Sequence, residues 1–348
     1  MSRIDWIVLR RIGGRVGLTV AVLFGLLCLV ESLDSSRFRL LSGIGGPLLA
    51  IAAIVVAAAR NVVGTLPVTV LIGTIIGALD LQAHRELTVI KAAGISIWRI
   101  VRAPVAAALL LGLVVALVGD TLAIQFSRAM PANRTASDVW LEQRGPDGAF
   151  ILHARRALDN GRLLEDVSVY GTSELPRTRI EAPAARLEPG AWVLDDAIRY
   201  RADAAPERLA TLWLATTTTA GDMQVRLTSS RDLTFGELMA LVGDGVADPA
   251  LRAAALTSFV RLLALPVLLA GSVLMGFAFT SGYRRTNKYG GAVLYGVVLG
   301  FVVYVVTELA IRSGSAGALD PTFAAGGPAF VAVVIGLTVL LYREDGRA

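Results

Sequence analysis

The segment HRELTVIKAAGIS, residues 84–96, separates two long apolar runs of the chain. Leu87, Ile90 and Lys91 recur at i, i+3 and i+4, a spacing that predicts a short helix. Gly94 predicts the C-terminal cap of this helix, with a new helix starting soon after it. Two interpretations follow. The segment is a solvated loop helix between two membrane spans, or a docking helix through which a cytoplasmic partner moves the membrane part.

The composition is that of an integral membrane protein. The mean hydropathy of the 348 residues is +0.64, 55% of them are hydrophobic, and the apolar residues come in runs. A formal net charge of +5 could indicate a nucleic-acid partner. The basic residues, however, flank the apolar runs, and the positive-inside rule explains that placement directly. We therefore expect no nucleic-acid partner.

The sequence shows none of the familiar motifs of metal, cofactor or catalytic sites. Cys28 is the only cysteine, so no disulfide or cysteine-ligated metal site can form within one chain. The two histidines, His84 and His153, are expected on opposite sides of the membrane, which disfavours a zinc site. Neither Lys91 nor Lys288 lies in a phosphate-binding Gly-x-x-x-x-Gly-Lys motif. If the protein transports a substrate against a gradient, we therefore expect that it does not hydrolyse ATP itself, and we expect neither enzymatic activity nor a cofactor.

The apolar runs predict six membrane spans in two groups of three. These spans cover residues 16–33, 66–81, 104–126, 262–279, 290–311 and 323–342. Residues 43–47 predict a turn. The run 48–81 that follows is longer than the roughly 20 residues a span needs, and Arg60 and Pro67 interrupt it. It forms either two short spans, or one span over 66–81 preceded by an interfacial helix. We favour the second, because the first leaves almost no loop.

The basic residues orient the spans. The flanks that face the cytoplasm in this arrangement contain Arg3, Arg10, Arg11, Arg15, Arg85, Lys91, Arg99, Arg102, Arg284, Arg285, Lys288, Arg343 and Arg347. The short outer loops hold only Arg37, Arg39 and Arg312. This bias places both termini and the segment 84–96 in the cytoplasm. Because the chain has no ATPase motif of its own, a cytoplasmic position favours the docking interpretation.

A region of about a hundred residues without a span lies between spans three and four. Short alternating stretches, such as Ala-Trp-Val-Leu at 191–194, are separated by turn sequences such as Gly-Pro-Asp-Gly at 145–148. This pattern predicts an all-β domain, a sandwich or open roll, outside the membrane. The expected domains are 1–130 (spans one to three, with the docking helix at about 84–95), 131–231 (the β domain) and 232–348 (a linker helix and spans four to six).

Charged residues near the spans are candidate functional groups. A charge in the bilayer is unfavourable and usually faces a cavity or a partner, although it can also reach the interface. The sequence leaves both alternatives open, a position facing a cavity or partner and a position at the interface, for five residues: Glu31, Asp34, Arg60, Asp120 and Glu308. A basic rim at the outer face would suit lipid phosphates, which arginine binds bidentately. Its expected members are Arg37, Arg39, Arg60, Arg128 and Arg134.

The chain resembles the LptF/LptG (YjgP/YjgQ) permeases of the lipopolysaccharide exporter over nearly its whole length. The most specific match is RELTVIKAAGIS (residues 85–96), which is similar to the family's Ser-Glu-Leu-x-x-x-(Arg/Gln)-Ala-(Ser/Ala)-Gly. Pro67 and the sequence DLTFGEL (232–238) also match. Arg85 departs from the pattern, because serine is usual there.

The resemblance implies a multi-pass protein of the bacterial inner membrane, with a periplasmic jellyroll-like β domain. It implies that the segment is a coupling helix that docks into a groove of the ATPase LptB. Glu86 is the expected contact, and the coupling-helix residues are Arg85, Glu86, Leu87, Ile90, Lys91 and Gly94. Further implied partners are an LptF paralogue in a heterodimer, LptC, LptA and lipopolysaccharide. Spans one and five are implied as lateral gates, with Glu31, Asp34, Tyr304 and Glu308 facing the gate or cavity.

Two stretches resemble LptG more than LptF, namely LVESLD (29–34) and FVVYV (301–305). One departure is Glu31, because the LptG-like position near it is often basic. Arg37 or Arg39 would then have to provide the phosphate contact. The alternatives are the LptF paralogue, a permease for another anionic lipid, and a membrane-anchored β-domain scaffold. Six spans with interior charges disfavour a scaffold, which needs only one anchor.

Overall fold

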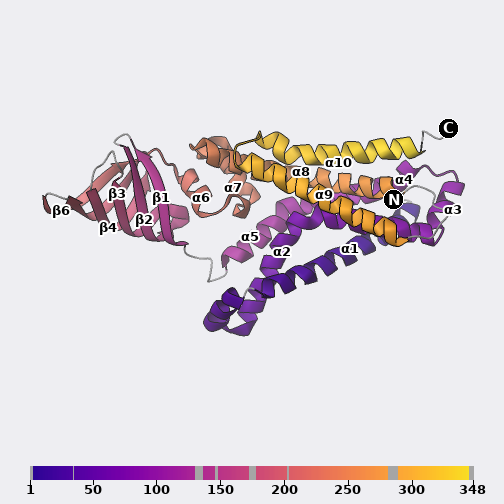
Figure 1. The fold of residues 1–348 in the computed structure, drawn as a ribbon, viewed down its shortest axis with the longest axis horizontal. Coiled ribbons are helices and arrows are strands. Elements are labelled where there is room, and N and C mark those ends of the chain that lie inside the picture. Colours follow the sequence, from indigo (N-terminus) through magenta and orange to yellow (C-terminus); the bar gives the residue numbers. More distant parts are fainter. Residues whose placement is uncertain are drawn as a thin grey trace. The chain divides into compact units, whose positions relative to one another are not determined.

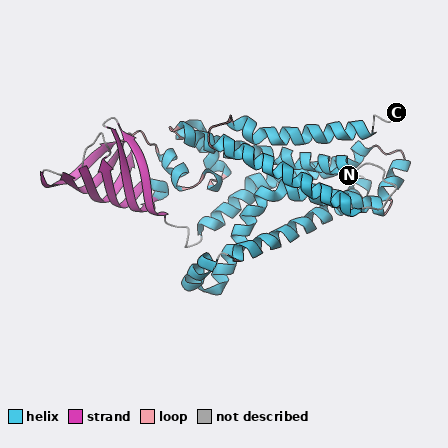
Figure 2. Ribbon diagram, viewed as in Figure 1, coloured by secondary structure: helices cyan, strands magenta, loops and turns pink. Residues whose placement is uncertain are grey.

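The computed structural model describes residues 3–33, 35–129, 136–145, 148–171, 178–201, 204–280 and 289–344. The chain divides into two compact units. The first comprises Met1–Ser127 and Thr257–Ala348, and the second comprises Arg128–Leu256. Figure 1 traces the elements of both units, and Figure 2 shows that the first is helical while the strands belong to the second.

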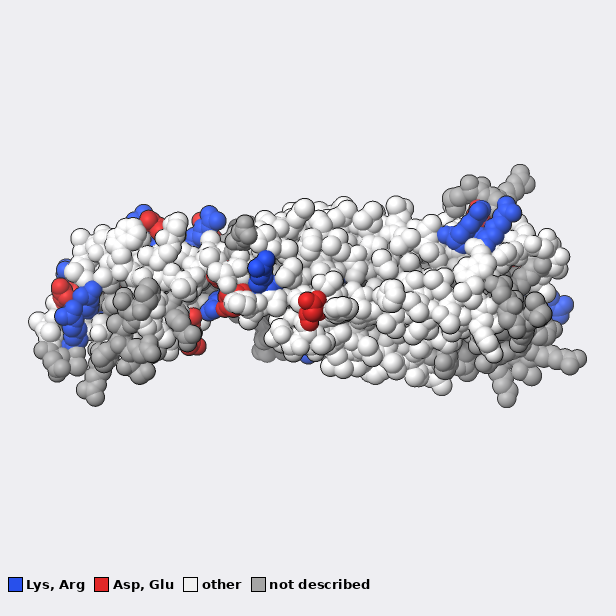
Figure 3. Space-filling model, turned by 90° about the horizontal axis from the view of Figure 1, so that it is seen from above, with Lys and Arg blue, Asp and Glu red and all other residues white. Residues whose placement is uncertain are grey.

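The first unit is built from long apolar helices. Its elements are α1 (Arg3–Ser32), α2 (Ser35–Ala83), α3 (Glu86–Ala92), α4 (Ile97–Val114), a π-helical turn (Val115–Gly119), most of α5 (Asp120–Ala129), most of α8 (Pro249–Thr280), α9 (Tyr289–Ser315) and α10 (Pro321–Glu344). Within the described residues, six helical segments are long and apolar enough to cross a membrane. The predicted six spans are therefore confirmed. The face drawn in Figure 3 is largely uncharged over these helices.

Helix α2 corrects one expectation about the second span. Residues 43–47 lie inside α2, so the predicted turn does not end the helix there, although Gly46 has a φ of +78°; Pro47 also lies within the helix. From there the helix continues through Arg60 and Pro67 to Ala83 without a break. The two-short-spans alternative is wrong, and no separate interfacial helix ends before residue 66. The apolar segment Gly46–Ala83 has 38 residues, about 57 Å of helix at 1.5 Å per residue.

Helix α8 is the most buried span of the first unit. In its most apolar 18-residue window 72% of the residues are buried, against 6% in α1. A Cβ on Gly112 of α4 would lie 2.5 Å from the Cα atom of Pro266, so glycine permits α4 to approach α8 closely. Gly73 of α2 likewise lies against the backbone of Val16 on α1. Small residues allow such contacts between membrane helices, where packing rather than hydrophobicity drives association.

The second unit contains one six-stranded antiparallel sheet. Its strands are β1 (Ala136–Gly145), β2 (Gly148–Leu158), β3 (Leu163–Gly171), β4 (Thr178–Glu188), β5 (Ala191–Arg201) and β6 (Ala204–Ala215), and they lie side by side in sequence order. One face buries a core around Phe150, Leu152, Leu164 and Trp192. The inserted all-β domain is confirmed. At one end β1 approaches β6, because a Cβ on Gly145 would lie 2.3 Å from the Ala215 carbonyl oxygen.

Two short helices complete the second unit, α6 (Ala220–Leu227) and α7 (Phe235–Ala240). Each begins with a capping box, formed by Thr219 with Asp222 and by Thr234 with Glu237. A π-helical turn, Leu241–Gly245, extends α7. The amphipathic helix predicted over 232–248 is therefore present, in a shorter form.

Candidate coupling site

The caps of α3 hold the predicted coupling helix between two spans. Arg85 precedes the helix with a φ of +57°, and Gly94 follows it with a φ of +75°. The N–H of Ile95 donates to the carbonyl oxygen of Ile90 at 3.4 Å, which is the 6→1 bond of a Schellman cap. Ser96 then caps α4, since its side chain accepts from the N–H of Trp98. The predicted stop and restart of the helix are confirmed.

Helix α3 has one anchored face and one open face. Leu87 is buried and Ile90 is half-buried, so these two side chains fix the helix to the unit. Thr88, Val89 and Ala92 are exposed, although Val89 and Ala92 are apolar. The side chain of Lys91 lies outside the described part. A short, anchored helix with an exposed, weakly polar face can receive a partner protein.

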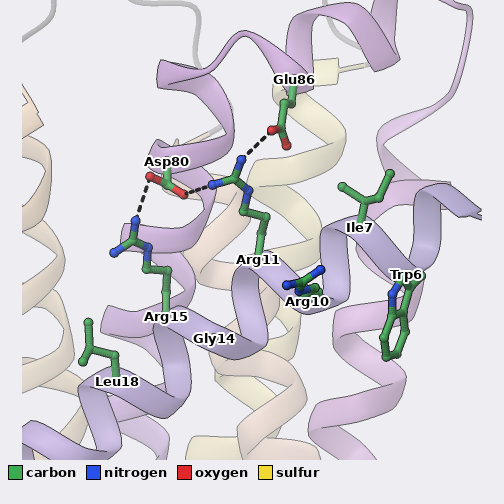
Figure 4. A pocket seen from close by; sticks show the side chains of 9 residues that line it. All are labelled: Trp6, Ile7, Arg10, Arg11, Gly14, Arg15, Leu18, Asp80 and Glu86. Atoms are coloured by element: carbon green, nitrogen blue, oxygen red, sulfur yellow. Dashed lines mark hydrogen bonds and ion pairs between the residues drawn. The ribbon is translucent and has the colours of Figure 1, made fainter.

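The carboxylate of Glu86 is only half satisfied. Its Oε1 accepts a hydrogen bond from Nη2 of Arg11 on α1 at 2.7 Å. Its Oε2 is buried and has no hydrogen-bond partner among the described residues. Figure 4 shows the Arg11 side chain reaching from α1 to this carboxylate at the start of α3. One oxygen therefore ties α3 to α1, while the other is buried without a donor among the described residues.

Asp80 extends this contact into a cluster of four charged residues. It lies near the end of α2, where it accepts from Arg11 at 3.2 Å and from Arg15 at 3.0 Å. The Asp80 side chain is 14% exposed, so water and salt screen its ion pairs less than they screen a pair on the surface. Arg11 and Arg15 are one turn apart on α1, so both face the same carboxylate (Figure 4). We call Arg11, Arg15, Asp80 and Glu86 the Arg11 cluster.

An open cavity adjoins the Arg11 cluster. Its volume is about 650 Å³. It is lined by Trp6, Ile7, Arg10, Arg11, Gly14, Arg15, Leu18, Asp80 and Glu86 (Figure 4). The side chain of Arg10 is exposed at this cavity, and no ion pair of Arg10 occurs among the described residues.

A second ion pair binds α1 to the helix after α3. Arg102 of α4 donates to Asp5 of α1 at 2.7 Å, and the Asp5 side chain is only 4% exposed. Sequence reasoning missed both this pair and the Arg11 cluster, because it treated the arginines only as markers of the cytoplasmic side. The available signal was the i, i+4 spacing of Arg11 and Arg15, on the side of the membrane where Glu86 was also expected and where the predicted second span, with Asp80 near its end, terminates.

The outer candidates do not gather into one described cluster. Glu31 accepts from Asn61 at 2.8 Å, and Glu308 accepts from Arg312 at 2.8 Å within α9, one turn beyond the half-exposed Tyr304. Asp34 and Arg134 lie outside the described residues, as do the side chains of Arg37 and Arg39. Asp120 on the third span is buried, and the positive charges of Arg60 and Arg261 act on its carboxylate.

Arg128 belongs to the second unit and makes a bidentate ion pair there. Its Nη1 and Nη2 atoms donate to Oε1 and Oε2 of Glu237 at 2.7 and 2.9 Å. Nη2 also donates to the carbonyl oxygen of Asp232 at 2.6 Å. Burial of the Glu237 carboxyl acts to raise its pKa, but the bonds from Arg128 and Thr234 together lower that pKa below its ordinary value. This pair fixes the start of α7.

The described residues contain no group of three or more His, Cys, Asp or Glu side chains that could hold a metal ion. The charged groups of the first unit instead pair with one another between helices. Such an arrangement is suited to holding and moving helices.

The sequence profile of the lipopolysaccharide export system permease family LptF/LptG matches residues 6–343. The chain belongs to this family. No curated protein matches the chain significantly. As an LptF/LptG permease, it is a transport component of the bacterial inner membrane that serves lipopolysaccharide export, with six membrane-spanning helices and a β domain inserted between the third and fourth.

Proposed function

We propose that this LptF/LptG chain is the LptG-type subunit of the exporter and that the separately encoded ATPase LptB drives it through α3. Its further partners are an LptF paralogue in a heterodimer, LptC and LptA. It binds lipopolysaccharide and no cofactor of its own, since ATP is bound by LptB. The gate and lipid contacts proposed for it are those expected from the sequence, Glu31, Asp34, Arg37, Arg39, Arg60, Arg128, Arg134, Tyr304 and Glu308.

The state of Glu86 is the observation that supports this proposal most directly. A buried carboxylate oxygen without a donor is unfavourable, and a donor supplied by a partner removes that penalty. Leu87 anchors the same helix, while Val89 beside it is exposed and apolar. These features favour a protein partner at α3 over a solvated loop helix.

The mechanism follows from two conformational states of the complex. Closure of the ATPase on ATP pushes α3 and rocks the first three spans against the paralogue. That motion narrows the cavity between the two permeases and expels the lipid toward the β domain. The ATPase supplies the free energy, and the permease supplies contacts that differ between the two states.

Co-purification tests the coupling. In the assembled complex, Glu86→Arg should release most of the ATPase, because it replaces the acceptor with a like-charged group facing the donor. The matched control is Arg99→Glu, a charge reversal at an exposed residue of α4 on the same side of the membrane. Wild-type amounts of ATPase on the Glu86→Arg complex would contradict the proposal.

Photo-crosslinking tests the cargo. A photoreactive residue at Tyr304, which is half-exposed on α9, should capture lipopolysaccharide in membranes that contain it. The same residue at Phe330 of α10, an exposed apolar site, is the control for non-specific capture. Capture of ordinary phospholipid alone at Tyr304 would show that the cargo is a different lipid.

A further inference from the structure

We propose that Arg11 is a positioning residue that ties the coupling helix to α1, so that α1 is displaced together with α3 when the ATPase moves. This inference rests on the proposed function, because it assigns the transmission of the force that α3 receives. Two ion pairs carry it: Arg11–Glu86 connects α1 to α3, and Arg102–Asp5 connects α1 to α4, the helix that follows α3.

Arg11 bonds two carboxylates on two different helices. One nitrogen of its guanidinium donates to Asp80 of α2, and another donates to Glu86 of α3. A planar guanidinium can serve two carboxylates in fixed directions, whereas an ammonium acts as a single point charge. The side chain therefore fixes the angle between the end of α2 and the start of α3, with α1 as the third member of the joint.

The second step is the Arg102–Asp5 pair on the far side of the coupling segment. Arg102 lies on α4, six residues after Ser96 caps that helix, and Asp5 lies six residues before Arg11 on α1. Asp5 is almost fully buried, whereas the Arg102 side chain is exposed. The elements that precede and follow α3 are thus both held to the same short stretch of α1.

The third step is the packing of the rest of α1. Val8 and Ile12 are buried, but no residue of α1 after Ile12 is. Leu18, Val22, Leu26 and Leu29 are all exposed. The ties of α1 to its own chain are therefore strongest at the end that carries the ion pairs. Beyond Ile12, α1 is held to α2 by the close approach of Val16 to Gly73 and by the hydrogen bond from Asn61 to Glu31. A displacement of α3 is passed to the end of α1 that carries the ion pairs.

A purely structural role for Arg11 makes a different prediction from a positioning role. A structural ion pair changes the thermal stability of the complex and its yield. A positioning residue changes how much lipid moves for each ATP that is hydrolysed. The deciding quantity is therefore the ratio of lipopolysaccharide transferred to ATP hydrolysed, which does not depend on the amount of complex recovered.

The experiment uses the whole complex in proteoliposomes that contain lipopolysaccharide, with a soluble periplasmic acceptor. Arg11→Gln should lower the transfer-to-hydrolysis ratio about tenfold, the usual size of a coupling factor between two sites. Arg11→Lys should restore part of the ratio, since an ammonium can still pair with one carboxylate. The control is Arg10→Gln, which removes a neighbouring positive charge from the same cavity and should leave the ratio at the wild-type level.

A wild-type ratio for Arg11→Gln would overturn the inference, and so would an equal loss for Arg10→Gln. If the Arg11→Gln complex does not assemble, Arg102→Gln tests the second tie at an exposed side chain. It should lower the ratio, and a wild-type ratio there would overturn the inference. The proposed function is judged separately by ATPase retention in Glu86→Arg. If Glu86→Arg loses the ATPase while Arg11→Gln keeps the wild-type transfer-to-hydrolysis ratio, the proposed function is upheld and the role of Arg11 in moving α1 is refuted.

Discussion

Two arginine–glutamate pairs in this protein have the same length but different surroundings. Arg11–Glu86 in the first unit and Arg128–Glu237 in the second both have a shortest contact of 2.7 Å. Both oxygens of Glu237 are occupied, by Arg128 and by the N–H and hydroxyl of Thr234. Glu86 has one occupied oxygen and one without a donor among the described residues. A saturated pair stabilises its own unit, whereas an unsaturated pair can receive a partner.

The largest effect on stability is expected from breaking the saturated pair. Glu237→Ala removes two charged hydrogen bonds and the half of the α7 capping box that the Glu237 carboxylate makes, a combined loss of about 2–4 kcal/mol. Loss of hydrogen-exchange protection in α7 measures this effect. Glu86→Ala removes one half-exposed ion pair, which is worth about 1 kcal/mol or less. Equal losses from the two variants would refute the distinction between the pairs.

The next largest effect on stability is expected at Gly94, which ends the helix that carries Glu86. Gly94 has a φ of +75° and ends α3, so Gly94→Ala forces a Cβ into the left-handed region and should destabilise α3 by about 1 kcal/mol. The control is Gly17→Ala on α1, where a Cβ would meet nothing within 4 Å. Faster amide exchange in α3 should accompany Gly94→Ala alone. The same change in both variants would show that the cap does not hold the helix.

The sequence predicted the local features of the coupling helix well, because its cap chemistry lies within a dozen residues. The helix itself follows from the spacing of Leu87, Ile90 and Lys91, and its end at Gly94 follows from backbone preference. The continuity of α2 was not predictable in the same way. Pro67 usually marks a helix break in water, but membrane helices tolerate it where neighbouring groups compensate the lost hydrogen bond.

The Arg11 cluster was also beyond sequence reasoning. Arg11 and Glu86 are separated by 75 positions, and Arg15 and Asp80 by 65. Hydrophobic periodicity reports which face of a helix is apolar, but it does not report which helices adjoin. The pairing depends on the close approach of α1 and α2 at Gly73, a contact that only the folded chain specifies.

The smallest effect is a pH dependence of the saturated pair, Arg128–Glu237. The pKa of Glu237 is lowered in the folded protein because the bonds from Arg128 and Thr234 outweigh the opposing effect of burial. A carboxyl with a lowered folded pKa contributes its full stability above its unfolded pKa. That contribution is lost as the pH falls through the folded pKa. Because the pair is partly exposed, its size should stay below about 1 kcal/mol.

The test compares the wild type with Glu237→Gln at neutral pH and in mild acid. Glutamine keeps the shape of the side chain and cannot ionise, so the stability difference between the two proteins isolates the charge. That difference should be present at neutral pH and should shrink as the pH falls below the ordinary pKa of a glutamate. The stability difference is measured by thermal unfolding, with amide exchange in α7 as the local probe. A difference that is constant with pH would mean that packing, and not the charge on Glu237, distinguishes this pair from Arg11–Glu86.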